Sequence, residues 1–174
     1  MASKKKKLIV NSLHAKINDE LRNEYKKLGK ACGWNFGERN DTDFFEQIYR
    51  ILHLKYRCAQ NELRSLQAVS NFFKSYEWLI GHYLKNFLSI VMEIHRRKGL
   101  SFDEKLFYID KLKCQSTYDE VRLIFYYVIS LMEEADEKIE VLKMFDQYRF
   151  FEGIKKLLVY PEDWPDYQLL LTSE

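Results

Sequence analysis

The sequence predicts an all-α protein that folds as a single-domain bundle of about six to eight helices. Helix breakers are scarce, because the 174 residues include only two prolines and six glycines. Apolar residues make up 47% of the chain and aromatic residues 16%, which favours buried helices over a turn-rich β fold. Apolar residues also recur at helical spacings of three and four along most of the chain. We therefore expect Tyr and Phe side chains to fill a single core.

The first two predicted helices flank a glycine-containing loop. Residues 5–28 carry apolar side chains three and four apart, which is typical of an amphipathic helix. Residues 29–40 contain three glycines and two aromatic residues, which indicates a structured loop. After this loop, Asp41 or Thr42 can cap a second helix that extends to about residue 60.

The next stretch has no proline, and Gly81 is its one glycine before residue 99. It predicts a short helix over residues 62–74 and a long one over 76–98, or else one bent helix that includes both. The basic residues of the last turn, followed by Gly99, mark the end of the long helix.

The clearest helix starts are two Ser/Thr-x-x-Glu sequences, one at Ser101 with Glu104 and one at Thr117 with Glu120. At this spacing the two side chains satisfy each other's free backbone N–H groups in the first turn of a helix. We therefore predict that helices begin near residues 102 and 118.

The rest of the chain predicts two further helices, over residues 137–148 and 150–159. Two prolines near the end predict an extended tail over 161–174. No linker, repeat or composition shift divides the chain. We therefore expect one helical domain over residues 1–174, with a flexible basic N-terminus at 1–6.

The sequence lacks the motifs that are typical of several classes of function. The net charge is only +2, from 28 basic and 26 acidic residues, so no global field favours nucleic acid or membrane. There is no glycine-rich phosphate loop, and the four histidines lack the spacing of a metal site. The sequence therefore predicts no metal, no cofactor and no catalytic residues. An enzyme of unrecognised type stays open, because some active sites assemble without local motifs.

Cysteine usage and hydropathy predict the compartment. The three cysteines are isolated, without a Cys-x-x-Cys pair, which fits a reducing cytoplasm. The apolar run after the basic N-terminus is too short for a signal peptide. Charged residues interrupt the longest apolar region, 76–94, whereas a membrane helix needs about 20 predominantly apolar residues. We expect a cytoplasmic protein that does not enter a membrane.

Two short basic patches are candidates for anion or nucleic-acid contact. The first is Lys4, Lys5, Lys6 and Lys7, and the second is Arg96, Arg97 and Lys98. Lysines near a chain terminus are also typical of a solvated, frayed end, and cations at a helix C-terminus also stabilise the helix dipole. Nucleic-acid binding through these patches is the alternative function that the sequence offers.

One segment follows the pattern of a known family. Its matching residues are Tyr83, Glu104, Lys105, Gln115, Glu120, Leu123, Phe125 and Tyr126. Residues 83–129 thereby resemble the putative phage abortive infection family, with weaker similarity at 43–52 and 148–152. The segment departs from the family pattern at Lys113, Cys114, Ser116 and Tyr127.

The resemblance implies a bacterial anti-phage defence protein. It implies a non-enzymatic role, in which the chain binds a protein partner or joins a larger defence complex. We interpret Gln115, Glu120 and Tyr126 as the partner-binding site, because a polar corner between two helices can hold a fixed geometry for a partner. The identity of the partner and the oligomeric state do not follow from the sequence.

Overall fold

The computed structural model describes residues 19–21, 23, 26–27, 44–58, 66–131 and 136–154. The chain divides into two compact units, residues 1–60 and 61–174. The described residues are helical or in turns and contain no strand, which confirms the all-α prediction. The single domain stays a prediction. The basic N-terminus at 1–6, the loop at 29–40 and the tail at 161–174 lie outside the described residues.

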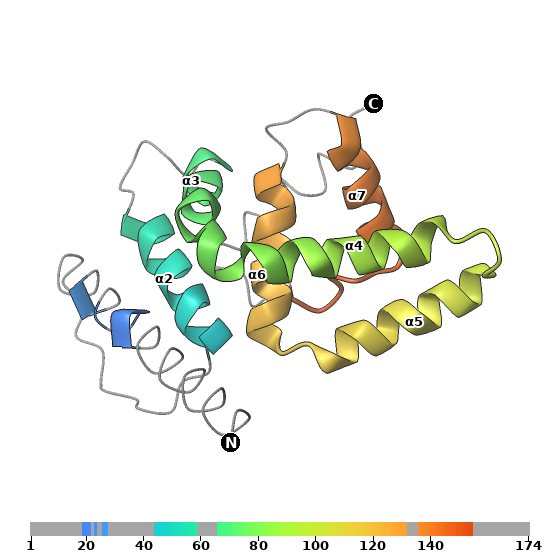
Figure 1. The fold of residues 1–174 in the computed structure, drawn as a ribbon, viewed down its shortest axis with the longest axis horizontal. Helices are drawn as coiled ribbons and strands as arrows, with labels where there is room; N and C mark the ends of the chain where they lie inside the picture. Colours follow the sequence, from blue (N-terminus) through green and yellow to red (C-terminus); the bar gives the residue numbers. More distant parts are fainter. Residues whose placement is uncertain are drawn as a thin grey trace, which may run out of the picture. The chain divides into compact units, whose positions relative to one another are not determined.

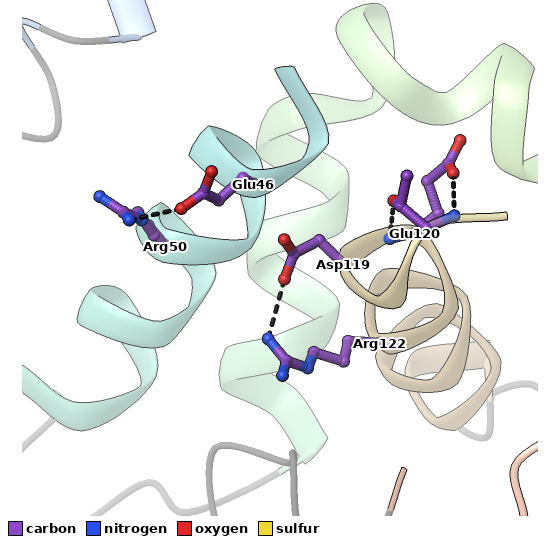
Figure 2. A network of polar contacts seen from close by, with 6 residues as sticks. Glu46, Arg50, Asp119, Glu120 and Arg122 are labelled. Carbon is purple, nitrogen blue, oxygen red and sulfur yellow. Dashed lines mark hydrogen bonds and ion pairs between the residues drawn. The ribbon is translucent and has the colours of Figure 1, made fainter. Parts of the chain in front are cut away.

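The first unit contains helix α2, Phe44–Cys58, within the range that the sequence predicts. Its buried apolar side chains are Ile48, Tyr49, Ile51, Leu52 and Leu54. Glu46 and Arg50, one turn apart, form an ion pair on this helix (Figure 2). Within the predicted helix at 5–28, the described residues 19–21, 23 and 26–27 are helical.

The second unit holds the remaining helices (Figure 1). In chain order they are α3 (Leu66–Tyr76), the π-helix η1 (Glu77–Gly81), α4 (His82–Arg96), α5 (Phe102–Gln115), α6 (Tyr118–Ser130) and α7 (Asp136–Gln147). Helix α6 packs against α3 and α7. Helices α4 and α5 lie side by side and run in opposite directions, joined by a short turn (Figure 1).

Helix α6 is central to the second unit. From position 121 to position 130, every residue except Arg122 is buried, so this helix is enclosed on nearly all sides. Aromatic rings from other elements pack around it. Phe73 of α3 meets Tyr127 at 5.2 Å between ring centroids, and Phe151 meets Phe125 at 5.2 Å. Burial of such a ring contributes roughly 1.5–3 kcal/mol. The prediction that Tyr and Phe fill the core is confirmed.

The helix does not break between residues 74 and 76. Instead, η1 connects α3 to α4 as a single helical segment whose direction changes at the π-turn (Figure 1). The structure thus has the bent helix that the sequence allowed. A π-turn adds one residue to the helical ladder, and this insertion is a known cause of kinks.

Both predicted helix starts are confirmed in detail. At Ser101, the hydroxyl accepts from the Glu104 N–H at 3.4 Å, and the Glu104 carboxylate accepts from the Ser101 N–H at 2.8 Å. The same reciprocal pair occurs between Thr117 and Glu120, at 3.2 and 2.6 Å. Helices α5 and α6 therefore begin at residues 102 and 118, as predicted.

The predicted helix at 150–159 is wrong over residues 150–154, because 150–153 form turns and 154 is not helical. Helix α7 ends in a Schellman motif, in which the Phe150 N–H donates to the Phe145 carbonyl and the Arg149 N–H to the Asp146 carbonyl, both at 2.9 Å. Arg149 takes the left-handed conformation that this motif requires, with φ of 49°. The rings of Phe145 and Phe150 then meet at 5.1 Å between centroids. These interactions end the helix, and residues 155–159 lie outside the described part.

Replacement of Arg149 by glycine is expected to stabilise the protein. The left-handed conformation costs a non-glycine residue roughly 1 kcal/mol or more, whereas glycine adopts it freely. The Arg149 side chain is exposed, so its loss removes little packing. We expect Arg149→Gly to raise the free energy of unfolding by about 0.5–1 kcal/mol, measured by urea denaturation. Arg149→Ala is the control, because alanine in the left-handed conformation keeps the backbone strain. An equal gain in stability for both variants would contradict the assignment of the gain to relief of this strain.

Candidate interaction site

The best-defined polar contact between helices in the second unit is centred on Glu120, at the start of α6. One carboxylate oxygen of Glu120 accepts from the Thr117 N–H and so completes the helix cap (Figure 2). The other accepts from the Tyr83 hydroxyl of α4 at 2.9 Å. Beside it, Asp119 and Arg122 form an ion pair at 2.8 Å (Figure 2). A single carboxylate thus both begins α6 and joins it to α4.

The environment of Tyr83 favours its neutral form. Burial, and then the hydrogen bond to the Glu120 carboxylate, raise the pKa of the Tyr83 phenol well above its ordinary value of 10.0. A hydrogen bond with Ser116 acts in the opposite direction and is weaker. The phenol therefore stays protonated and remains a hydrogen-bond donor to Glu120 throughout the physiological range of pH.

The three residues predicted as a partner-binding site lie in different environments. Gln115 is exposed at the end of α5, and Glu120 is partly buried in the corner described above. Tyr126 is only 1% exposed, and its ring packs edge-on against Phe125 at 5.3 Å between centroids. The structure therefore does not bring the three side chains together on one surface. The family pattern alone does not reveal that Tyr126 is buried, because α6 is apolar and buried on nearly all sides and its sequence marks no solvent-facing side.

Helix α5 presents aromatic side chains to solvent. Ile109 is the one α5 residue that the structure buries fully. Phe107 and Tyr108 are 56% and 48% exposed, and their ring centroids are 5.7 Å apart. The Lys111 ammonium lies 5.4 Å from the centre of the Phe107 ring. Because residues four apart share a helix face, Phe107, Lys111 and Gln115 follow one another along it.

We call Phe107, Tyr108, Lys111 and Gln115 the α5 aromatic face. Gln115 was predicted as a partner-binding residue, whereas Phe107 and Tyr108 were missed. A signal for them exists in the sequence, because both lie outside the apolar stripe of this helix, which runs through Phe102, Leu106, Ile109 and Leu112. Two adjacent aromatic residues off the stripe predict exposed rings.

The second basic patch is largely paired with carboxylates. Arg96 of α4 contacts Glu140 of α7 at 3.2 Å, and Arg97 contacts Glu93 at 3.2 Å. Lys98 is exposed. These cations follow the C-terminal end of α4, where positive charge stabilises the helix dipole. The first patch, Lys4–Lys7, lies outside the described residues.

A second polar contact joins three elements near the end of α4. The Tyr148 hydroxyl lies 3.0 Å from Nδ1 of His95, and the Phe102 ring stacks on Tyr148 at 5.8 Å. Burial raises the pKa of the Tyr148 phenol. No group of three or more His, Cys, Asp or Glu residues that could hold a metal occurs in the part of the chain that the structure describes. The contact joins α4, α5 and the turn after α7.

The Tyr83–Glu120 contact and the α5 aromatic face both lie inside a segment that is similar to a known family. Residues 75–157 match the family model of the putative phage abortive infection protein. This match confirms the resemblance that the sequence suggested, and it extends from the end of α3 beyond α7. The same comparisons matched no curated protein and no solved structure.

The membrane prediction can be compared with the helices of the structure. Among the described residues, no helix has both the length and the apolar content that a membrane crossing requires.

A double-mutant cycle tests whether Tyr83 and Glu120 act together. Tyr83→Phe removes the donor, and Glu120→Gln keeps a side chain that can still complete the cap. We expect the two changes to be coupled by about 0.5–1 kcal/mol in the free energy of unfolding. Either single substitution removes the same charge-assisted hydrogen bond, so the double variant loses less stability than the sum of the two single variants.

Glu104→Gln is the matched control for this cycle. Glu104 caps α5 as Glu120 caps α6, and its carboxylate accepts from the N–H and the hydroxyl of Ser101 within the same cap. We expect its effect to add to that of Tyr83→Phe within about 0.3 kcal/mol. Equal coupling for both glutamates would show that the caps, and not the bond to α4, determine the stability.

The contribution of Tyr83 should also depend on pH. Its pKa is raised in the folded protein, so the unfolded state loses the phenol proton first as the pH increases. The stability that Tyr83 contributes is therefore complete below about pH 10 and is lost above it. We expect the difference in unfolding free energy between the wild type and Tyr83→Phe to be constant from about pH 7 to 9 and to shrink above about pH 10. A difference that grows above pH 10 would contradict this assignment.

Proposed function

We propose that this chain is a component of a bacterial anti-phage, abortive infection system, and that it acts by binding a protein partner through the α5 aromatic face. The similarity of residues 75–157 to the family supports the defence role. The observation that supports the binding role is the exposure of Phe107 and Tyr108, two large rings on a helix that buries one residue fully. We also propose that it acts in the cytoplasm, where the exposed thiol of Cys114 would stay reduced.

The α5 aromatic face has the chemical features of a protein-binding surface. Aromatic side chains dominate the energetics of protein interfaces, because a ring buries a large area at a small cost in conformational entropy. The rings are carried by a helix that is capped at its start and packed along α4, so they are held in place before a partner arrives. Lys111 and Gln115 add polar groups beside them.

The charges around Phe107 favour a protein partner over a nucleic acid. Asp103 and Asp110 lie one turn to either side of it and are exposed, and these two carboxylates outnumber the Lys111 ammonium that lies over the ring. Their carboxylates would repel a phosphate backbone, whereas they complement Arg or Lys side chains on the rim of a protein surface. We therefore expect the partner to present an apolar pocket bordered by basic residues.

Nucleic-acid binding through Lys4–Lys7 and Arg96–Lys98 stays a prediction. Arg96 and Arg97 each contact a carboxylate, so an approaching phosphate would have to compete with an existing ion pair. Such binding would weaken steeply with salt, because it depends on counterion release.

The proposed function is tested by plating phage on cells that carry the gene. We expect the wild-type gene to reduce plaque numbers for at least one phage of a broad panel, and Phe107→Ala with Tyr108→Ala to restore them to the level of an empty vector. Affinity purification from the native host should recover a protein with the wild type and not with the double variant. The loss of two anchor rings typically lowers affinity by at least tenfold, that is by about 1.4 kcal/mol or more.

Trp78→Ala is the matched control, because Trp78 is 65% exposed and lies on η1 rather than on α5. We expect it to protect cells as the wild type does. Thermal unfolding of all variants shows whether they remain folded, which is expected since the substituted rings are exposed. Protection that survives the double substitution would rule out the α5 aromatic face, and equal plating with and without the gene on the whole panel would count against the defence role.

A further inference from the structure

A cavity of about 270 Å³ lies beside the π-turn, between α3, η1, α4 and the end of α6. Its floor is apolar and buried, since Ile80 and Leu84 are each 1% exposed. Its rim is charged, because the side chains of Glu77 and Lys85 are both 59% exposed and the exposed Lys74 also lines it. The cavity is slightly smaller than the ~300–1,000 Å³ of typical drug-sized sites, so it suits a small ligand.

The π-turn shapes this cavity. Gly81 ends η1, and a Cβ atom at that position would lie 2.8 Å from Cγ of Glu77. The absence of a side chain at Gly81 therefore lets the stem of Glu77 lie across the turn, with its carboxylate bonded to Lys85. π-Turns within α-helices often occur at functional sites.

Two polar groups of the cavity are suited to hold a ligand. Lys85 carries its charge at the rim, where its partner Glu77 is also exposed, and exposed ion pairs of this kind are weak enough to exchange. The Glu77 hydrogen bond raises the pKa of Lys85, so the amine is charged. Deeper in the cavity, Ser70 is only 5% exposed and carries a hydroxyl that can donate or accept.

We propose that this cavity binds a small molecule with an apolar or aromatic body and one carboxylate or phosphate group. The apolar body lies on Ile80 and Leu84, and the anion pairs with Lys85 in place of Glu77. Ser70 donates a hydrogen bond to the buried end of the ligand. Carboxylate and phosphate share the chemistry that Lys85 recognises, and the test below separates them.

The cavity and the α5 aromatic face are separate surfaces. No residue of α5 lines the cavity, and Phe107, Tyr108, Lys111 and Gln115 lie elsewhere on the second unit. A test of ligand binding at the cavity and a test of partner binding at α5 can therefore succeed or fail independently.

Calorimetric titration of the full chain with three probes tests the proposal. The probes are phenylacetate, phenyl phosphate and the uncharged phenylacetamide. We expect at least one of the two anions to bind with a Kd in the millimolar range or below, and phenylacetamide to bind at least about tenfold more weakly. The stronger of the two anions identifies the group that the site prefers.

Two substitutions at the rim should act in opposite directions. Lys85→Gln is expected to weaken anion binding by about tenfold, because the cation is lost. Glu77→Gln is expected to strengthen anion binding by about two- to fivefold, because the ligand no longer has to displace the Glu77 carboxylate from Lys85. Lys111→Gln, on α5, is the matched control and should leave binding unchanged. Absence of binding by both anions, or equal effects of Lys85→Gln and Lys111→Gln, would overturn the proposal.

Discussion

The arrangement of α4, α5 and α6 depends on the carboxylate of Glu120. One of its oxygens completes the cap of α6, and the other accepts from Tyr83 on α4. Neither contact can shift without weakening the other, because both belong to one rigid planar group. Burial and this hydrogen bond raise the pKa of the Tyr83 phenol, so it remains a donor to a higher pH than an ordinary tyrosine. The start of α6 is therefore held against α4, and α5, which connects them, has its C-terminal end determined by the same group.

This constraint explains how α5 can expose its aromatic rings. Helices normally gain stability by burying one face, yet α5 buries only Ile109 fully. Other contacts hold it instead. The Lys105 ammonium donates to the His95 carbonyl at 2.7 Å, and the Lys113 ammonium donates to the Arg149 carbonyl at 3.2 Å. These contacts hold α5 in place while Phe107 stays 56% exposed.

The structural features that the sequence predicted correctly are those determined by residues close together in the sequence. Both caps involve side chains three positions apart, so their spacing is enough to locate the starts of α5 and α6. The bond between Tyr83 and Glu120 joins residues 37 positions apart, which no local pattern reveals. The turn after α7 was missed because Arg149, and not glycine, takes the left-handed conformation. Tyr126 was misplaced because α6 is apolar on every side, so its periodicity does not indicate which residues face solvent.

The near-neutral charge of the chain, +2 from 28 basic and 26 acidic residues, bears on recognition. Among the described residues, Arg96, Arg97 and Lys85 each contact a carboxylate at the surface, so these charges are matched over short distances. Such exposed pairs add little to stability, and their fields cancel beyond about a Debye length. Long-range attraction to a polyanion is then weak, and binding must depend on contact. Exposed rings on a firmly held helix provide contact of that kind, and this is the basis for our proposal that the α5 aromatic face binds a protein partner.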